Sequence, residues 1–127
     1  MLPTRPLTLA ISLGLCSLGA TAYAHGGNVP EHGGVLKLVA DTSVELVRKP
    51  AGVEVWVEDE GEEVPSATLT GKLVIHEAGA TKEVELQPAA GNMLQAQGLQ
   101  IGHGAKVTVT VAPKAGHQKT TANFIIK

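Results

Sequence analysis

Gly52–Glu60 reads GVEVWVEDE, and this stretch decides the fold because its apolar residues recur at every second position. Side chains of a β-strand point alternately to the two faces of a sheet. The set expected to face a core is Val53, Val55 and Val57. The set expected to face outward is Glu54, Trp56 and Glu58. The stretch therefore predicts a strand that is buried on one face.

The same period of two recurs after Gly34 and predicts an all-β domain. The expected strands are Val35–Val39, Ser43–Lys49, Val53–Asp59, Ala67–His76, Lys82–Leu86, Met93–Ala96, Lys106–Val111 and Thr120–Ile126. Further residues expected to face the core are Ala67, Leu69, Gly71, Leu73, Ile75, Val107, Val109 and Val111. Short connections with Pro or Gly are typical of antiparallel hairpins; they are Lys49–Gly52, Glu77–Ala80 and Pro113–Gly116. We expect a single Ig-like antiparallel β-sandwich of about seven to eight strands.

The amino terminus has the features of a cleaved export signal, assigned to residues 1–24. Arg5 precedes an apolar run, Leu7–Ala20, and small residues follow at two cleavage positions, after Ala22 and after Ala24. The run is shorter than the roughly 20 residues of a membrane-spanning helix, and no second run follows. We expect a periplasmic protein without membrane insertion, in which a Gly/His-rich segment, residues 25–34, precedes a β domain, residues 35–127.

Composition excludes several classes of function once the signal is removed. The one cysteine, Cys16, lies within the signal, so the exported chain has no thiol for a disulfide or a thiolate metal site. The exported chain keeps nine of the ten basic residues and has twelve acidic ones. This slightly acidic balance argues against nucleic acid as a partner. Trp56 and Phe124 are the only aromatic residues left, too few for a stacking platform. No nucleophile elbow, zinc-protease motif or phosphate loop is present, so we expect no enzyme.

The segment HGGNVPEHGG, His25–Gly34, predicts a metal site. With cleavage after Ala24, the α-amine and the imidazole of His25 form a chelate that suits Cu(II), and His32 is the nearest further ligand. With cleavage after Ala22, the start Tyr23-Ala24-His25 offers an amine, two amides and an imidazole to Cu(II) or Ni²⁺. We expect Cu(II), with Zn²⁺ or Ni²⁺ as alternatives. The competing interpretation is a polar tail whose histidines bind nothing.

Two further histidines extend the predicted metal site. In an antiparallel fold the loops alternate between two poles, which places His76 and His103 at the same pole as the start of the first strand. The predicted metal residues are therefore His25, His32, His76 and His103, and His117 falls at the opposite pole. The acidic run Glu58–Glu63 is interpreted as a solvated turn, because it lacks the spacing of a calcium loop.

The run EHGGVLKLVADTSVELVRKPAGVEVWVEDEGEEV, with SATLTGKLVI and PAAGNMLQAQG, resembles a small exported β domain of Gram-negative heavy-metal efflux systems. That domain is similar to one that can precede the periplasmic adaptor of such pumps. The layout with histidine first is also similar to that of small periplasmic copper carriers of the CopC type. The resemblance implies a role in heavy-metal resistance and an efflux adaptor as a partner. The alternative is an interaction module that docks by its sheet edge and binds no metal.

Overall fold

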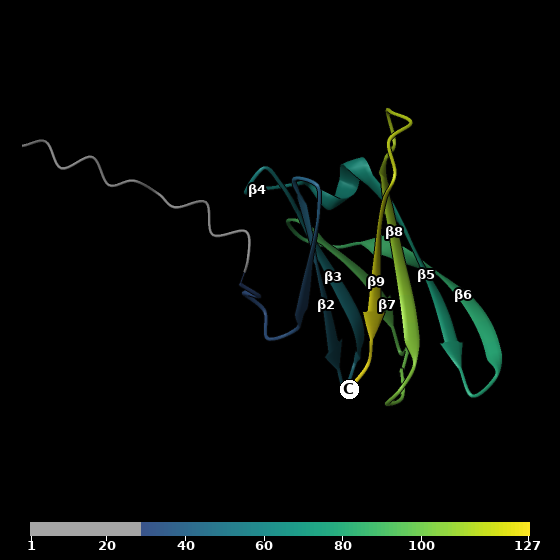
Figure 1. Cartoon of the computed structure of the whole chain (residues 1–127). Coiled ribbons are helices and arrows are strands. Elements are labelled where there is room, and N and C mark those ends of the chain that lie inside the picture. Colours follow the sequence, from purple (N-terminus) through teal and green to yellow (C-terminus); the bar gives the residue numbers. More distant parts are fainter. Residues whose placement is uncertain (1–28) are drawn as a thin grey trace, which may run out of the picture.

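Antiparallel strands make up nearly all the regular structure of residues 29–127, the part of the chain that the computed structural model describes (Figure 1). The strands are β1 (Val35–Val39), β2 (Thr42–Lys49), β3 (Gly52–Asp59), β4 (Glu62–Glu63), β5 (Leu69–Glu77), β6 (Ala80–Pro88), β7 (Met93–Gln97), β8 (Lys106–Pro113) and β9 (Thr120–Ile125). The expected export signal, both cleavage positions and His25 lie outside the described residues. The all-β prediction is confirmed.

The strands form one continuous path in the order β1-β2-β3-β7-β6-β5-β8-β9, with β4 paired to β3. The β6–β7 ladder holds only the pairs Gln87↔Gln95 and Pro88↔Leu94, and it is the shortest link in this path. Its two end strands, the blue β1 and the yellow β9, lie next to each other in Figure 1. The sheet is therefore nearly barrel-shaped, and the expected sandwich of two sheets is not confirmed.

Alternation along the strands builds the core as the sequence predicted. Val53, Val55 and Val57 are at most 2% exposed, whereas Trp56 between them is half-buried on the outer face. The other fully enclosed apolar side chains include Val44, Leu73, Leu94, Val107 and Val109. Each side chain of this size contributes roughly 1.5–3 kcal/mol when removed from water. An aliphatic core thus holds the strands together.

One local feature differs from the predicted strands. Ala67 is exposed and lies in a 3₁₀ turn, Ser66–Thr68, so the expected strand at 67–76 begins only at Leu69. The turn is closed by the backbone N–H of Thr68, which donates to the carbonyl of Pro65 at 3.0 Å, and the buried Ser66 hydroxyl anchors it by donating to the carbonyl of Ala89 at 2.6 Å. The prediction that Ala67 faces the core is wrong for this reason.

The acidic run Glu58–Glu63 folds as a tight hairpin in which β4 pairs with the end of β3. Glu60 and Gly61 both have positive φ, at 52° and 79°, as a two-residue turn between antiparallel strands requires. The acidic side chains of this hairpin are exposed, apart from the half-buried Glu58.

Among the described residues, no helix has the length and apolar character needed to cross a membrane.

Candidate metal centre

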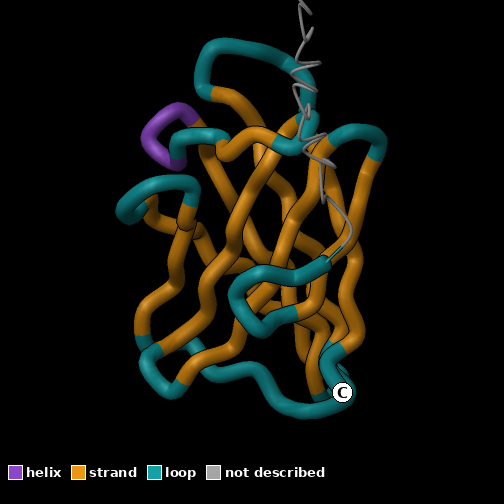
Figure 2. The backbone as a smooth tube through the Cα atoms, turned by 90° about the vertical axis from the view of Figure 1, so that its left-hand side faces the viewer, coloured by secondary structure: helices purple, strands orange, loops and turns teal. Residues whose placement is uncertain are grey.

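The segment before β1, residues 29–34, does not project from the end of the sheet but lies across the outer face of β2 and β3. In Figure 2 it is the loop in front of the strands, at the end of the grey trace. Gly34 makes this close approach because a Cβ there would collide with the backbone carbonyl of Leu46 and meet Cγ2 of Val47 at 2.8 Å. The segment therefore covers the outer face of β2, where Glu45 and Val47 are both buried.

A buried carboxylate, Glu45, holds the segment in place. Its Oε1 accepts from the backbone N–H groups of His32, at 2.9 Å, and Gly34, at 3.0 Å. Its Oε2 accepts from the backbone N–H of Glu31, at 3.2 Å, and from Nδ1 of His32, at 2.8 Å. Hydrogen bonds to an ionised group are the stronger kind, at about 1.5–3 kcal/mol each. This single side chain therefore satisfies three backbone donors of an irregular segment and orients an imidazole.

The protonation state of Glu45 follows from these contacts. Burial by itself would raise the pKa of a carboxyl group at 3% exposure. The hydrogen bonds from the His32 ring and from the backbone of Gly34, His32 and Glu31 outweigh burial, so the pKa of Glu45 lies below its ordinary value. Glu45 is accordingly a carboxylate at neutral pH, and a carboxylate can only accept.

The ring of His32 is held between this carboxylate and the indole of Trp56. The two rings stack with centroids 3.6 Å apart and planes 6° from parallel. Because the Glu45 carboxylate can only accept, Nδ1 of His32 carries the proton, and in the neutral ring the lone pair is then on Nε2. The His32 side chain is 29% exposed. The geometry therefore presents one imidazole in a defined tautomer and orientation at the surface.

Glu58 adds negative charge beside this pair. It lies on the outer face of β3, two residues from Trp56, and lines the same small hollow as Val29 and His32. Burial is the largest cause that raises the pKa of Glu58, and the negative charges of Glu31 and Glu63 raise it further. A cation at this place would be attracted by the surrounding carboxylates.

Val29 lines the same hollow together with His32 and Trp56. His25, the other predicted ligand of the amino-terminal segment, lies outside the described residues.

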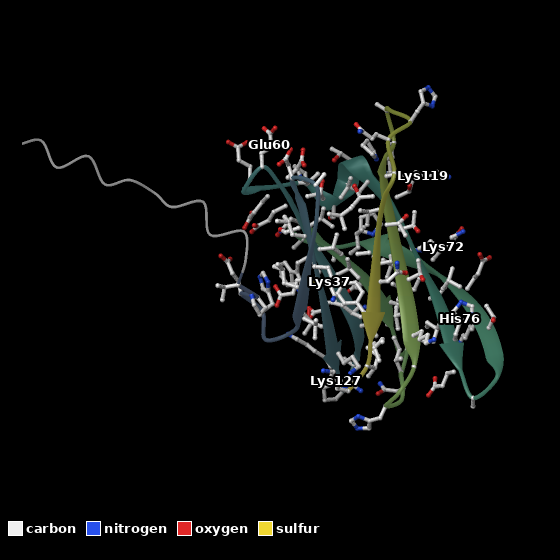
Figure 3. All side chains as sticks on the ribbon, in the orientation of Figure 1. Lys37, Glu60, Lys72, His76, Lys119 and Lys127 are labelled. Atoms are coloured by element: carbon white, nitrogen blue, oxygen red, sulfur yellow. The ribbon has the colours of Figure 1, made fainter. Side chains whose placement is uncertain are left out.

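The other predicted ligands do not join His32. His76 lies on the exposed face of β5, where its Nδ1 is 2.9 Å from Oγ1 of its cross-strand partner Thr81; Figure 3 shows it beside β6, on the other side of the molecule from β2. His103 is exposed in the turn before β8. Across residues 29–127, no three His, Cys, Asp or Glu side chains form a group that could hold a metal ion. The described residues thus supply His32 and no second imidazole.

The loops do alternate between the two ends of the fold, as the sequence predicted. The loops that contain Ala51 and Gly98 are joined by a hydrogen bond of 2.8 Å, and Gly102 donates to Glu77 at 2.9 Å. His103 therefore shares a pole with the β5–β6 turn, whereas His117 lies in the β8–β9 connection at the opposite end (Figure 1). His32 is at neither pole, because its segment turns back to the middle of β2 and β3.

The residues predicted from the sequence did not include Glu45, and no stacking role was expected for Trp56. A signal was present: the short turn after β2 implies the antiparallel pair Glu45↔Trp56, and strand alternation places both on the outer face. The chain offers a single tryptophan, and an acidic residue directly opposite it on a hairpin is a candidate for a shared role. Residues 29–34, which cover that face, follow no periodic pattern, so their position could not be predicted in the same way.

Comparison with protein-family models, with curated proteins and with solved structures finds no match to this chain.

Proposed function

We propose that this is a periplasmic binding protein for Cu(II), which serves heavy-metal resistance or efflux and has no catalytic role. The ligands are the α-amine and imidazole of His25, with Nε2 of His32 as the third nitrogen. The observation that carries the proposal is the orientation of His32, whose Nδ1 is bound to the Glu45 carboxylate and whose ring is stacked on Trp56. A ligating histidine in proteins usually donates its other ring N–H to such a carboxylate.

The preference for copper follows from the donors. A chelate of amine and imidazole nitrogens with square geometry suits Cu(II), and divalent copper binds nitrogen sites more tightly than Zn²⁺ or Ni²⁺. The described residues contain no cysteine, and Met93 is their only methionine, so they lack the soft sulfur ligands that Cu(I) selects. Zn²⁺ and Ni²⁺ are the expected weaker competitors.

Glu45 is a positioning residue for this site. A carboxylate on Nδ1 fixes the tautomer in which the lone pair is on Nε2. A glutamine in its place would present either an amide oxygen or an amide NH₂ to Nδ1, so the tautomer would no longer be fixed. Loss of such a partner typically lowers metal affinity by about 10–100-fold.

The test is a Cu(II) titration of the exported protein followed by electron paramagnetic resonance. We expect one dominant nitrogen-rich site, weaker in His32→Ala, weaker still when a residue is added before His25, and about 10–100-fold weaker in Glu45→Gln. His117→Ala and Glu85→Gln are the controls, since both residues are exposed and distant from β2 and β3.

Acidification separates this site from carboxylate binding. Imidazole ligates only when neutral and an amine only when deprotonated, so copper should be released below about pH 6. Copper held by the acidic β3–β4 hairpin would instead remain bound to about pH 5. Equal affinity in wild type, His32→Ala and the extended protein would refute the proposed site. Absence of Cu(II) binding in wild type would favour an interaction module that binds no metal.

A further inference from the structure

The segment of residues 29–34, here called the clasp, is held on the barrel by few contacts. None of its residues belongs to a strand ladder or to the backbone–backbone hydrogen bonds of the turns and loops in the described chain. Its four hydrogen bonds all go to the side chain of Glu45 on β2. Only His32 and Gly34 are partly buried, and the rest of the clasp is exposed. A segment of this kind opens more easily than a strand of the barrel.

The clasp covers three side chains on the outer face of the β2–β3 hairpin (Figure 2). Val47 lies beneath Gly34, where an added Cβ would meet its Cγ2 at 2.8 Å. Glu45 and Val47 are only 3% and 4% exposed, and the ring of His32 covers Trp56 at 3.6 Å. None of the three covered side chains belongs to the core. Lifting of the clasp would therefore expose them to water and leave the core intact.

Docking of the clasp changes the metal-binding properties of His32. In the docked clasp, Glu45 accepts from Nδ1 at 2.8 Å, so the lone pair of the neutral ring is on Nε2. In a lifted clasp the ring loses both Glu45 and Trp56, and its proton can be on either nitrogen. The carboxylate partner of a ligating histidine is typically worth about 10–100-fold in metal affinity. A metal ion on Nε2 therefore binds the docked clasp more tightly than the lifted clasp by about this factor.

From this difference we propose that the clasp is a latch operated by metal. A metal ion on His32 holds the clasp down on β2 and β3, and loss of the ion lets it lift and uncover Glu45, Val47 and Trp56. The inference rests on the proposed function, since it requires metal at His32. Linkage is reciprocal, so an ion that prefers the docked clasp stabilises docking by the same factor. Removal of the metal should raise the ratio of lifted to docked clasp by about 10–100-fold.

The chelate by itself is a second way in which metal could order this part of the chain. A metal ion shared by His25 and His32 closes a loop and restricts the amides inside it, whether or not the clasp is docked. Gly34 lies outside that loop, and its N–H donates to Glu45 at 3.0 Å. Protection of the Gly34 amide from exchange therefore reports docking.

The test is hydrogen–deuterium exchange of the exported protein at pH 7, resolved to single residues by mass spectrometry, with one equivalent of Cu(II) and without metal. We expect Cu(II) to slow exchange of the amides of Glu31, His32 and Gly34 by about 10–100-fold. The amides that join β5 to β8, a ladder that the clasp does not touch, should be unchanged. In Glu45→Gln the clasp amides should exchange fast, and Cu(II) should slow them much less, because the docking contacts are lost while the metal ligands remain.

The matched variants for the reciprocal effect are Gly34→Ala and Gly116→Ala. Gly34→Ala disturbs docking without removing any proposed ligand, because the added methyl group collides with the backbone of Leu46. We expect faster exchange of the clasp without metal and Cu(II) binding that is about 10–100-fold weaker. Gly116→Ala should leave both unchanged, since a Cβ there would meet Pro113 at an ordinary 3.6 Å. Circular dichroism checks that the barrel of each variant is folded.

Four results would overturn the latch, and they separate it from the proposed function. Cu(II) bound through His32 with unchanged exchange at Gly34 would remove the latch and leave the metal site standing. Equal slowing by Cu(II) in wild type and Glu45→Gln would assign the protection to the chelate alone. Undiminished Cu(II) affinity in a Gly34→Ala protein whose clasp exchanges fast would mean that docking and binding are not linked. Absence of Cu(II) binding in wild type would overturn the proposed function and the latch together.

Discussion

Glu45 shows how one side chain can decide the structure of a whole segment. A lone carboxylate at 3% exposure would be strongly unfavourable, yet here it meets three backbone donors and an imidazole N–H. Glu58, on the neighbouring strand, is also partly shielded from water, but it gains no such donors and lies near Glu31 and Glu63. The two acids on one face therefore have opposite electrostatic roles.

Glu45 should make stability depend on pH. The pKa of Glu45 is lowered in the folded state. The Glu45 carboxylate therefore stabilises the fold fully above the pKa of a glutamate in the unfolded chain, about 4.3, and this stabilisation is lost as the pH falls through the pKa of Glu45 in the folded protein. Urea unfolding from pH 7 to pH 3 should show this loss in wild type and a smaller one in Glu45→Gln. Matching pH profiles for the two proteins would contradict the assignment.

Ionisation of Glu58 should have the opposite effect on the free energy of unfolding. The pKa of Glu58 is raised in the folded state, so its ionisation disfavours the fold above that pKa. Glu58→Gln should therefore increase the free energy of unfolding at pH 7, and the increase should disappear once the pH is below about 4. The same urea titrations measure this, with Glu85→Gln on the exposed β6 strand as control. A destabilised Glu58→Gln protein at pH 7 would refute the prediction.

At the scale of the element, residues 29–34 act as a clasp on the outer face of the β2–β3 hairpin. The clasp has no periodic pattern and no ladder, and its contacts are those to Glu45 and Trp56 together with the close approach at Gly34. The covered face buries Glu45 and Val47. Docking of the clasp therefore depends on a few specific contacts and can be lost while the barrel stays folded.

Gly34→Ala should release the clasp. The added methyl group collides with the backbone of Leu46, which cannot move without disturbing β2. We expect a loss of about 1–3 kcal/mol in the free energy of unfolding and a shift of Trp56 fluorescence to longer wavelength as water reaches the indole. Gly116→Ala is the control, because a Cβ there would meet Pro113 at an ordinary 3.6 Å. Unchanged fluorescence in Gly34→Ala would contradict the close approach.

For the whole molecule, stability depends on the aliphatic core, whose strands close almost completely around it. Leu73 on β5 is fully buried at the centre of the β6-β5-β8 ladders, while Leu38 on β1 is 53% exposed. The candidate metal site lies outside this core, on the outer face. Metal binding and folding of the barrel are therefore expected to be largely separate.

Leu73→Ala should be far more costly than Leu38→Ala. Truncation of an enclosed leucine leaves a cavity and costs about 2–5 kcal/mol. The exposed leucine should change the free energy of unfolding by no more than about 0.5 kcal/mol. Urea unfolding of both variants measures the difference. Similar losses would mean that Leu38 on β1 is covered in solution, for example by a second copy.

The sequence by itself determined the class of fold, most strand positions and which face of each strand is buried, since the period of two in stretches such as GVEVWVEDE is a local property of the backbone. It also located His32 as a candidate ligand. Only the tertiary structure decided that β3 pairs with β7, that β1 and β9 lie side by side, and that His32 contacts Glu45 and Trp56. These arrangements depend on contacts between residues distant in the chain. Such contacts form when the whole core is packed, and no local pattern specifies them.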